Sequence, residues 1–228
     1  MCGRFANRVK PEQIKKEFKV STSGALAFEP RYNIAPAQII DAVLDGQEGR
    51  ILAPLKWGLV PSWAKEATAN GMINARSETI SEKPSFREAF KKRRCIIPAS
   101  GFYEWQAARG KGTAKQPFYF YLNGREVFGF AGLWEEWLDK TTGELLETCT
   151  IITAQANKLL KPVHDRMPVI LHREDYDEWL DKNVKDTARL EKLLLPYPAD
   201  EMSSHAVSRS VNVPDTDTAE LIVPLNSL

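Results

Sequence analysis

Four residues of the kinds that carry covalent catalysis are spread along the chain: Cys2, Asn74, Glu104 and His164. Only Met1 precedes Cys2, so removal of that methionine would leave one residue with both a thiol and an α-amine. Glu104 interrupts the apolar run GFYEW, and His164 opens the stretch HDRMP just before the apolar VIL. A nucleophile, a carboxyl group, an imidazole and an amide are the components of a site for covalent catalysis.

Each of these residues also has a purely structural explanation. Glu104 could face solvent on a half-exposed strand, and His164 with Asp165 could cap the segment that follows. Asn74 and Arg76, in the stretch INARSE, could satisfy buried main-chain groups. Separation along the sequence cannot show whether the four residues meet in space, so both interpretations stay open at this point.

The composition is that of a globular protein, with 228 residues of which 43% are hydrophobic and 27% are charged. The net charge of +1 gives no overall basic signature of nucleic-acid binding. The basic run at 91–94 fits either a helix C-terminus or a phosphate contact. No run reaches the ~18 apolar residues of a membrane span, and the start lacks a secretory signal. We expect no membrane association and a cytoplasmic location, associated with the nucleoid in a bacterium.

The cysteines and histidines do not form a metal-binding or disulfide pattern. Cys2, Cys95 and Cys149 are far apart and lack a CxxC pair, and the three histidines are equally scattered. This spacing argues against a structural zinc site and against a disulfide framework. We therefore expect no metal and no cofactor. Cys95 and Cys149 lie in apolar runs and should pack as small buried residues.

Hydrophobic spacing predicts an α+β fold. Apolar runs predict strands, and 3.6-residue periodicity predicts helices. The predicted strands are 39–44, 95–99, 101–105, 117–122, 127–134 and 148–154, and the predicted helices are 11–18, 156–161, 173–182 and 186–194. Turn signals at 122–126 and 139–144 indicate that the last three strands are sequential and antiparallel. No linker divides the chain, so we expect one domain, 1–228, with a curved, barrel-like, mainly antiparallel β core flanked by short helices.

A set of sequence blocks resembles one family in the family's own order. The blocks are MCGRFA, RYNIAP (31–36), WGLVPSW (57–63), INARSET (73–79), GFYEW (101–105), ITAQAN (152–157), HDRMP (164–168) and HAVSR (205–209). Together they resemble the SRAP family, the SOS response-associated peptidases. The resemblance implies a protein that captures abasic sites in single-stranded DNA covalently. It also implies a compact domain with a positively charged DNA channel, and we expect it to act as a monomer.

The same resemblance implies roles for the catalytic residues. Cys2 would be the nucleophile, Glu104 the general acid and base, and His164 an assistant in opening the sugar ring. Asn74 would position the N-terminus and the sugar.

The resemblance also implies DNA contacts. Arg4, Arg76 and Arg166 resemble phosphate-binding arginines, Trp63 resembles a residue that stacks on bases, and Trp105 belongs to the same DNA-binding set. The sequence departs from the family pattern at Ser62, where a second tryptophan is common. It also departs at Met167, where a further basic residue occurs.

The chemistry explains why a cysteine would stand beside the amino terminus. An α-amine, with a pKa near ~7.8 against ~10.4 for lysine, has a roughly 400-fold larger neutral fraction at pH 7. That amine can attack the aldehyde of an opened abasic sugar to give an imine, and the thiol of the same residue can close a thiazolidine. Two alternatives stay open. One is a cysteine peptidase that acts on its own N-terminus, and the other is a non-covalent reader of single-stranded or modified DNA.

Overall fold

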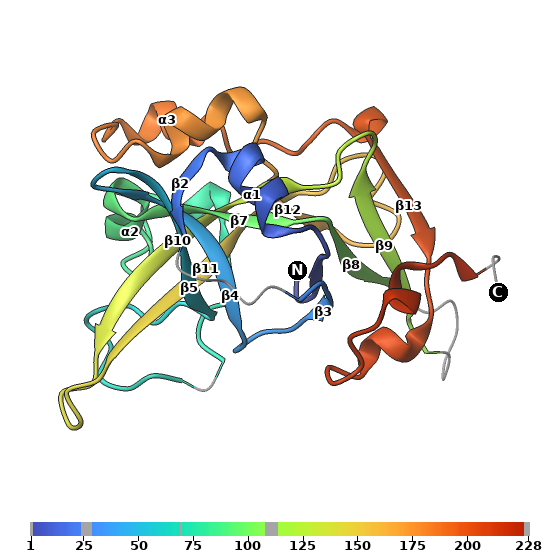
Figure 1. Ribbon diagram of the computed structural model, residues 1–228, viewed down its shortest axis with the longest axis horizontal. Coiled ribbons are helices and arrows are strands. Elements are labelled where there is room, and N and C mark those ends of the chain that lie inside the picture. Colours follow the sequence, from blue (N-terminus) through green and yellow to red (C-terminus); the bar gives the residue numbers. More distant parts are fainter. Residues whose placement is uncertain (1, 24–28, 69, 108–113, 226–228) are drawn as a thin grey trace.

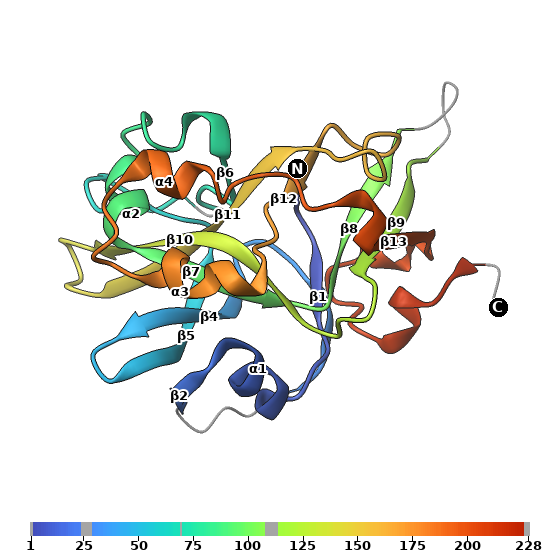
Figure 2. The same ribbon diagram turned by 90° about the horizontal axis from the view of Figure 1, so that it is seen from above.

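A computed structural model describes residues 2–23, 29–68, 70–107 and 114–225, and its strands form two sheets that lie side by side (Figure 1). The larger sheet closes into a barrel, and the smaller sheet is open. The predicted α+β class, with a curved, barrel-like and mainly antiparallel core, is confirmed. Short helices lie around the barrel when the molecule is viewed from above (Figure 2).

Within the described residues, five strands close the barrel. They are β4 (Ile39–Gly46), β5 (Gly49–Trp57), β7 (Arg94–Ala99), β10 (Phe128–Leu138) and β11 (Leu145–Gln155). Antiparallel pairing runs from β5 through β4, β7 and β10 to β11, and a parallel pairing of Cys149 with Trp57 completes the ring. Strand β7 reads RCIIPA and is buried throughout, as expected for a strand enclosed on both faces.

Three short strands extend the barrel sheet: β2 (Val20–Ser23), β6 (Asn74–Arg76) and β12 (Arg166–Pro168). Both β6 and β12 pair with the end of β11, where Thr153 lies opposite Arg76 on one side and Pro168 on the other. The end of β11 therefore brings the INARSE and HDRMP stretches, about 90 residues apart in sequence, to neighbouring positions in space.

The smaller sheet has the order β13-β9-β8-β1-β3. Its strands are β1 (Phe5–Asn7), β3 (Arg31–Ile34), β8 (Gly101–Gln106), β9 (Gln116–Leu122) and β13 (Met202–Ala206). Aromatic rings join this sheet to the barrel: Phe5 meets Trp57 edge-on with ring centroids 5.2 Å apart, and Phe102 meets Phe130 at 6.0 Å. These contacts fix the start of the chain against the barrel wall.

The helices are short, as the sequence predicts. They are α1 (Pro11–Phe18), α2 (Arg87–Lys92), α3 (Tyr176–Leu180) and α4 (Thr187–Glu191), and 3₁₀ turns span Ser77–Thr79, Arg173–Asp175, Ala199–Glu201, Arg209–Asn212 and Ala219–Ile222. Helix α1 has a proline at its first position and buries Ile14 and Phe18 on one face. In the basic run, Arg94 is buried and its guanidinium donates to five described main-chain carbonyls, including Phe90 O at 2.7 Å and Trp179 O at 2.6 Å.

Two predictions about elements are wrong. The stretch 156–161 forms turns and not a helix, because Asn157 Oδ1 accepts the main-chain N–H groups of Leu159 (3.1 Å) and Leu160 (3.0 Å). Strand β9 does not pair with β10, whereas β10 and β11 do pair antiparallel. After the turn at 122–126 the chain passes to the other sheet, and β13, about 80 residues later, takes the free edge of β9.

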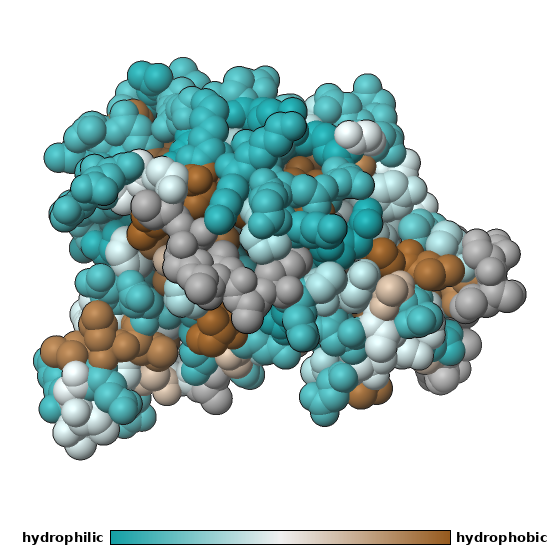
Figure 3. Space-filling model, in the orientation of Figure 1, coloured by the Kyte–Doolittle hydropathy of each residue, from teal (hydrophilic) through white to brown (hydrophobic). Residues whose placement is uncertain are grey.

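The paired ends of β10 and β11 extend beyond the barrel as an arm (Figure 1). Leu138 and Leu145 lie opposite each other near its tip and are 51% and 59% exposed, and apolar atoms gather at that corner in the space-filling view (Figure 3). Among the described residues, no helix combines the length and the apolar character that crossing a membrane requires.

Candidate functional site

Cys2 is fully buried at the point where the chain enters β1. The Asn74 side chain donates from Nδ2 to the main-chain carbonyl of Cys2 at 2.9 Å. Asn74 begins β6, and its pairing opposite Ile151 on β11 fixes it to the barrel wall. The amide therefore holds Cys2 in place from the barrel side. Met1 lies outside the described residues, so its predicted removal is not tested by the structure.

Glu104 lies on β8 beside the start of the chain and is only 3% exposed. Pairing of β1 with β8, with Phe5 opposite Phe102, continues through a hydrogen bond from Tyr103 N to Arg4 O at 3.0 Å. Burial raises the pKa of the Glu104 carboxyl, and the nearby His164 partly opposes that rise. The structure thus places Glu104 inside the protein and not on a half-exposed strand face.

The Cys2 thiol and the Glu104 carboxyl affect each other directly. Burial raises the pKa of the Cys2 thiol well above its ordinary value, and the Glu104 charge raises it further. A hydrogen bond to the main-chain N–H of Arg4 acts in the opposite direction. The thiol is therefore protonated at neutral pH. A nucleophile that must act as a preformed thiolate is disfavoured here, whereas a thiol that adds in a second step is compatible with this setting.

His164 lies just before β12 and is half-buried. Its Nδ1 lies 2.9 Å from the main-chain N and 3.2 Å from the main-chain O of Arg166, and it accepts the N–H in the tautomer that carries its proton on Nε2. His164 also acts on the pKa of Glu104. Cys2, Asn74, Glu104 and His164 are thus brought together, although the chain separates them by up to 162 positions.

A groove of about 520 Å³ opens beside these residues. It is lined by Arg76, Gln155, Lys161, His164, Asp165 and Arg166. Arg76 is exposed on β6, but Arg166 is only 9% exposed and its guanidinium forms an ion pair with both oxygens of Glu78. Arg166 also donates to the Thr153 carbonyl. Within the described lining, Lys161 is paired with Asp165 at 2.8 Å and Arg166 with Glu78, so the excess positive charge of the groove lies at the exposed Arg76.

The other residues assigned to DNA binding have different surroundings. Trp63 is 66% exposed on the loop that leaves the barrel at Gly58, whose φ of +140° suits only glycine. Trp105 is half-buried and donates from Nε1 to Asn212 Oδ1 at 2.7 Å. Arg4 is half-buried and is bound within the protein, as described below. A DNA contact for each of these residues stays a prediction.

Two partners in this region carried no signal in the sequence. Glu78 is the last residue of the INARSE stretch, and it lies in a 3₁₀ turn and neutralises Arg166. Asn33, within the RYNIAP block, is fully buried and bonds to Arg4. Neither pairing follows from residue spacing, because the partners are 88 and 29 positions apart.

A larger cavity, of about 740 Å³, lies away from this cluster. Its described lining contains the buried Glu17, which is held by Arg125 at 2.7 Å and by Arg173. None of the predicted site residues is among that described lining. In the described part of the chain, no three His, Cys, Asp or Glu residues are grouped so that they could hold a metal ion.

The geometry defines a closed β-barrel protein with a buried cysteine, a buried glutamate and a half-buried asparagine beside a cationic groove. A family model described as SOS response associated peptidase (SRAP) matches residues 1–214. The chain therefore belongs to the SRAP family, and the predicted resemblance is confirmed.

Individual relatives cover nearly the whole chain. It is 45% identical over 227 residues to the abasic site processing protein YoqW of Bacillus subtilis, covering 97% of this chain and 99% of that one. It is 30% identical over 269 residues to the abasic site processing protein HMCES of Xenopus tropicalis, covering 99% of this chain and 78% of that one. A crystal structure of a protein from Bacteroides thetaiotaomicron superposes with a TM-score of 0.88 at 27% identity, covering 98% and 99% of the two chains.

Proposed function

We propose that this protein processes abasic sites in DNA, and that it does so by covalent capture in single strands through the amine and thiol of Cys2. The names of its relatives support the first part of the proposal. The observation that carries the second part is the hydrogen bond from Asn74 to the Cys2 carbonyl at 2.9 Å, which fixes Cys2 beside the buried Glu104. The proposal requires that Met1 be removed, so that Cys2 has a free α-amine.

The reaction has three steps. Ring opening of the abasic deoxyribose exposes an aldehyde, and Glu104 is placed to donate and accept the protons of this step. The α-amine of Cys2 then adds to the aldehyde carbon, and loss of one water gives an imine. Finally, the Cys2 sulfur adds to the imine carbon and its proton passes to the nitrogen, which closes a five-membered thiazolidine.

The environment of each group suits this order of steps. Burial raises the pKa of Glu104, so this carboxyl keeps its proton to a higher pH than an exposed glutamate does. Burial likewise keeps the Cys2 thiol protonated, so the amine is the better first nucleophile and the thiol completes the ring. His164, whose ring acts on Glu104, is placed to relay protons during ring opening.

Single-stranded DNA would reach the site through the cationic groove. The exposed Arg76 would contact phosphate, and the exposed Trp63 would stack on an unpaired base. Stacking on Trp63 requires an unstacked base, so duplex DNA should bind less well. An encounter through phosphates alone depends strongly on salt concentration.

Intact-protein mass spectrometry tests the proposal. The protein is mixed with a single-stranded oligonucleotide that carries one abasic site, and the matched control carries a tetrahydrofuran analogue that cannot open to an aldehyde. We expect an adduct of the Met1-free protein plus the oligonucleotide minus one water, and no adduct with the analogue. Binding without any adduct would instead indicate a non-covalent reader of DNA, and an adduct on protein that retains Met1 would exclude the thiazolidine.

A further inference from the structure

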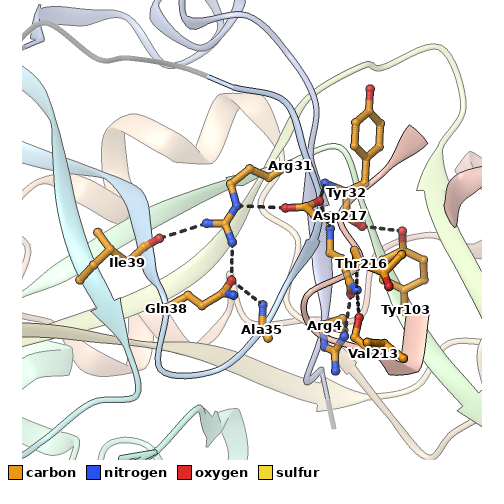
Figure 4. Close-up of polar contacts among 11 residues, drawn as sticks. Arg4, Arg31, Tyr32, Ala35, Gln38, Ile39, Tyr103, Val213, Thr216 and Asp217 are labelled. Carbon is orange, nitrogen blue, oxygen red and sulfur yellow. Dashed lines mark hydrogen bonds and ion pairs between the residues drawn. The ribbon is translucent and has the colours of Figure 1, made fainter. Parts of the chain in front are cut away.

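Residues 208–217, which follow β13, are bonded to β3, the strand that pairs with β1 (Figure 4). Asp217 Oδ1 accepts the main-chain N–H of Asn33 at 2.8 Å and that of Tyr32. The fully buried Asn33 side chain donates from Nδ2 to Val213 O at 2.9 Å and to Thr216 O at 2.6 Å. The 208–217 segment is therefore tied to β3 by buried and charged hydrogen bonds at several points.

The same two elements hold Arg4. Its Nη1 donates to Asn33 Oδ1 at 2.7 Å and to Val211 O at 2.7 Å. The main chain of Arg4 is bound to the site, because its N–H hydrogen-bonds the Cys2 sulfur and its carbonyl accepts the N–H of Tyr103. Arg4 thus connects the 208–217 segment to the nucleophile and to the strand that carries Glu104.

A second connection reaches the residue next to Glu104. Trp105 donates from Nε1 to Asn212 Oδ1 at 2.7 Å, and Tyr103 donates from its hydroxyl to Tyr32 O at 2.7 Å. The 208–217 segment therefore holds Arg4, two positions after Cys2, and Trp105, next to Glu104, while β3 holds Tyr103 on the other side of Glu104. Neither connection needs DNA, and both are formed in the free protein.

We propose that Arg4 and the 208–217 segment are positioning elements that keep Cys2 and Glu104 at a fixed separation, and that Arg4 serves this purpose in place of a phosphate contact. The inference rests on the proposed function. A reaction that joins two groups in sequence is sensitive to their placement, and a displacement of ~1 Å can cost roughly 100-fold in rate. Both N–H groups of Arg4 Nη1 already donate to acceptors within the protein, so they hold the guanidinium on the fold and leave only Nε and Nη2 for any other acceptor.

Two variants separate positioning from phosphate binding. Arg4→Ala removes the connection at the site, and Asp217→Ala removes it on β3, where the carboxylate binds main-chain N–H groups and Arg31. We expect both to slow crosslinking at saturating abasic DNA by roughly 10–100-fold. The half-saturating DNA concentration and the salt dependence of binding to undamaged strands should stay at the wild-type values. The double variant should be no slower than the slower single variant, because both break one connection.

Two matched variants distinguish a loss of positioning from a general loss of folding. Asp217→Asn keeps an oxygen that can accept both N–H groups, so it should restore most of the rate. Arg50→Ala removes an arginine that also donates from Nη1 to a main-chain carbonyl, Phe18 O at 2.8 Å, but outside the site, and it should crosslink at the wild-type rate. A weaker affinity and a flatter salt dependence for Arg4→Ala, with a wild-type rate for Asp217→Ala, would assign Arg4 to phosphate and overturn the proposal.

Hydrogen exchange distinguishes a failure of the positioning role from a failure of the proposed function. In the free protein, Asp217→Ala should speed exchange at the N–H groups of Arg4 and Tyr103, and this readout needs no DNA. If the wild-type protein forms no adduct but exchange quickens, the proposed function fails and the positioning role stands. If the wild-type protein crosslinks and both alanine variants match it in rate, the positioning role fails and the proposed function stands.

Discussion

Cys2 and Cys149 are both fully buried, but one lies at the entrance to β1 and the other within the barrel wall. Burial raises the pKa of both thiols, so neither is a ready thiolate. The difference is in their neighbours. Both pack in the same apolar cluster, but Cys2 also has a carboxyl group and an amide beside it, whereas Cys149 pairs opposite Trp134 within the barrel sheet. Burial does not distinguish a structural cysteine from a chemical one, and the polar groups around it do.

The comparison also explains how a buried thiol can take part in covalent chemistry. A peptidase-type mechanism needs a thiolate to attack first, and the surroundings of Cys2 disfavour that form. Ring closure onto an imine needs only a thiol that can pass its proton to a nearby base. In the proposed reaction Glu104, which is buried with the thiol, would be that base. The same burial that makes Cys149 inert is therefore compatible with the proposed role of Cys2.

The largest difference between the two cysteines is expected when each thiol is removed in turn and crosslinking is measured. Cys2→Ala keeps the α-amine, so it should form at most an imine, and the heat-stable adduct should be lost completely. Borohydride should preserve whatever imine forms. Cys149→Ala is the matched control and should crosslink fully, even if the smaller side chain lowers the stability of the barrel. Denaturing gels with and without reductant measure both, and a heat-stable adduct from Cys2→Ala without reductant would exclude the thiazolidine.

The next largest effect is on the rate of crosslinking. Glu104→Gln keeps the size of the side chain and removes proton transfer, which is typically worth ~10²–10⁴-fold. Crosslinking time courses should slow within that range, while affinity for undamaged single strands stays near wild type. The adduct that does form should have the wild-type mass. Crosslinking by Glu104→Gln at the wild-type rate would remove Glu104 from the mechanism.

Much of the architecture follows from local sequence. The apolar runs at 39–44, 95–99, 101–105 and 148–154 all lie in strands, and α1 follows from Pro11 with Ile14 and Phe18 on one face. Among the described barrel strands, β4, β7, β10 and β11 follow from continuous apolar runs, which burial on both faces produces, whereas β5 (Gly49–Trp57) was not predicted. The block set also identified the family, because its order along the chain is specific.

The remaining features depend on pairings between distant segments. Strand β9 pairs with β13 and not with β10, because a turn signal shows where a strand ends and not which edge it joins. The phosphate contact that the resemblance implies for Arg166 stays a prediction, and no local pattern predicts the ion pair of that side chain with Glu78. The bonds from Asn33 and Asp217 span about 180 positions, and no local pattern carries them.

A smaller effect is expected on DNA binding and on thermal stability, and it distinguishes two arginines of the same groove. Arg76 is exposed and Arg166 is buried against Glu78, so their loss should act on different quantities. Arg76→Ala should weaken binding to undamaged single strands and lower the slope of log affinity against log salt by about 1, with unchanged thermal stability. Arg166→Ala should lower thermal stability, because it leaves a carboxylate without its partner. Equal salt slopes for wild type and Arg76→Ala would assign Arg76 a structural role.

The smallest effect is on the pH dependence of stability, and its sign follows from the raised pKa of Glu104. Burial raises the pKa of this carboxyl, so the folded state binds its proton more tightly than the unfolded state, whose glutamate titrates near ~4.3. The stability this group contributes is complete below that value and is lost as pH rises through the raised pKa. The Gln side chain cannot ionise, so Glu104→Gln does not lose this stability as the pH rises. The variant should therefore melt above wild type by a few °C at pH 8 and match it below about pH 4. Glu136→Gln, at an exposed position of β10, is the matched control and should follow wild type at every pH. Melting curves across this range decide the question, because a constant difference between Glu104→Gln and wild type would mean that the ionisation of Glu104 does not oppose folding.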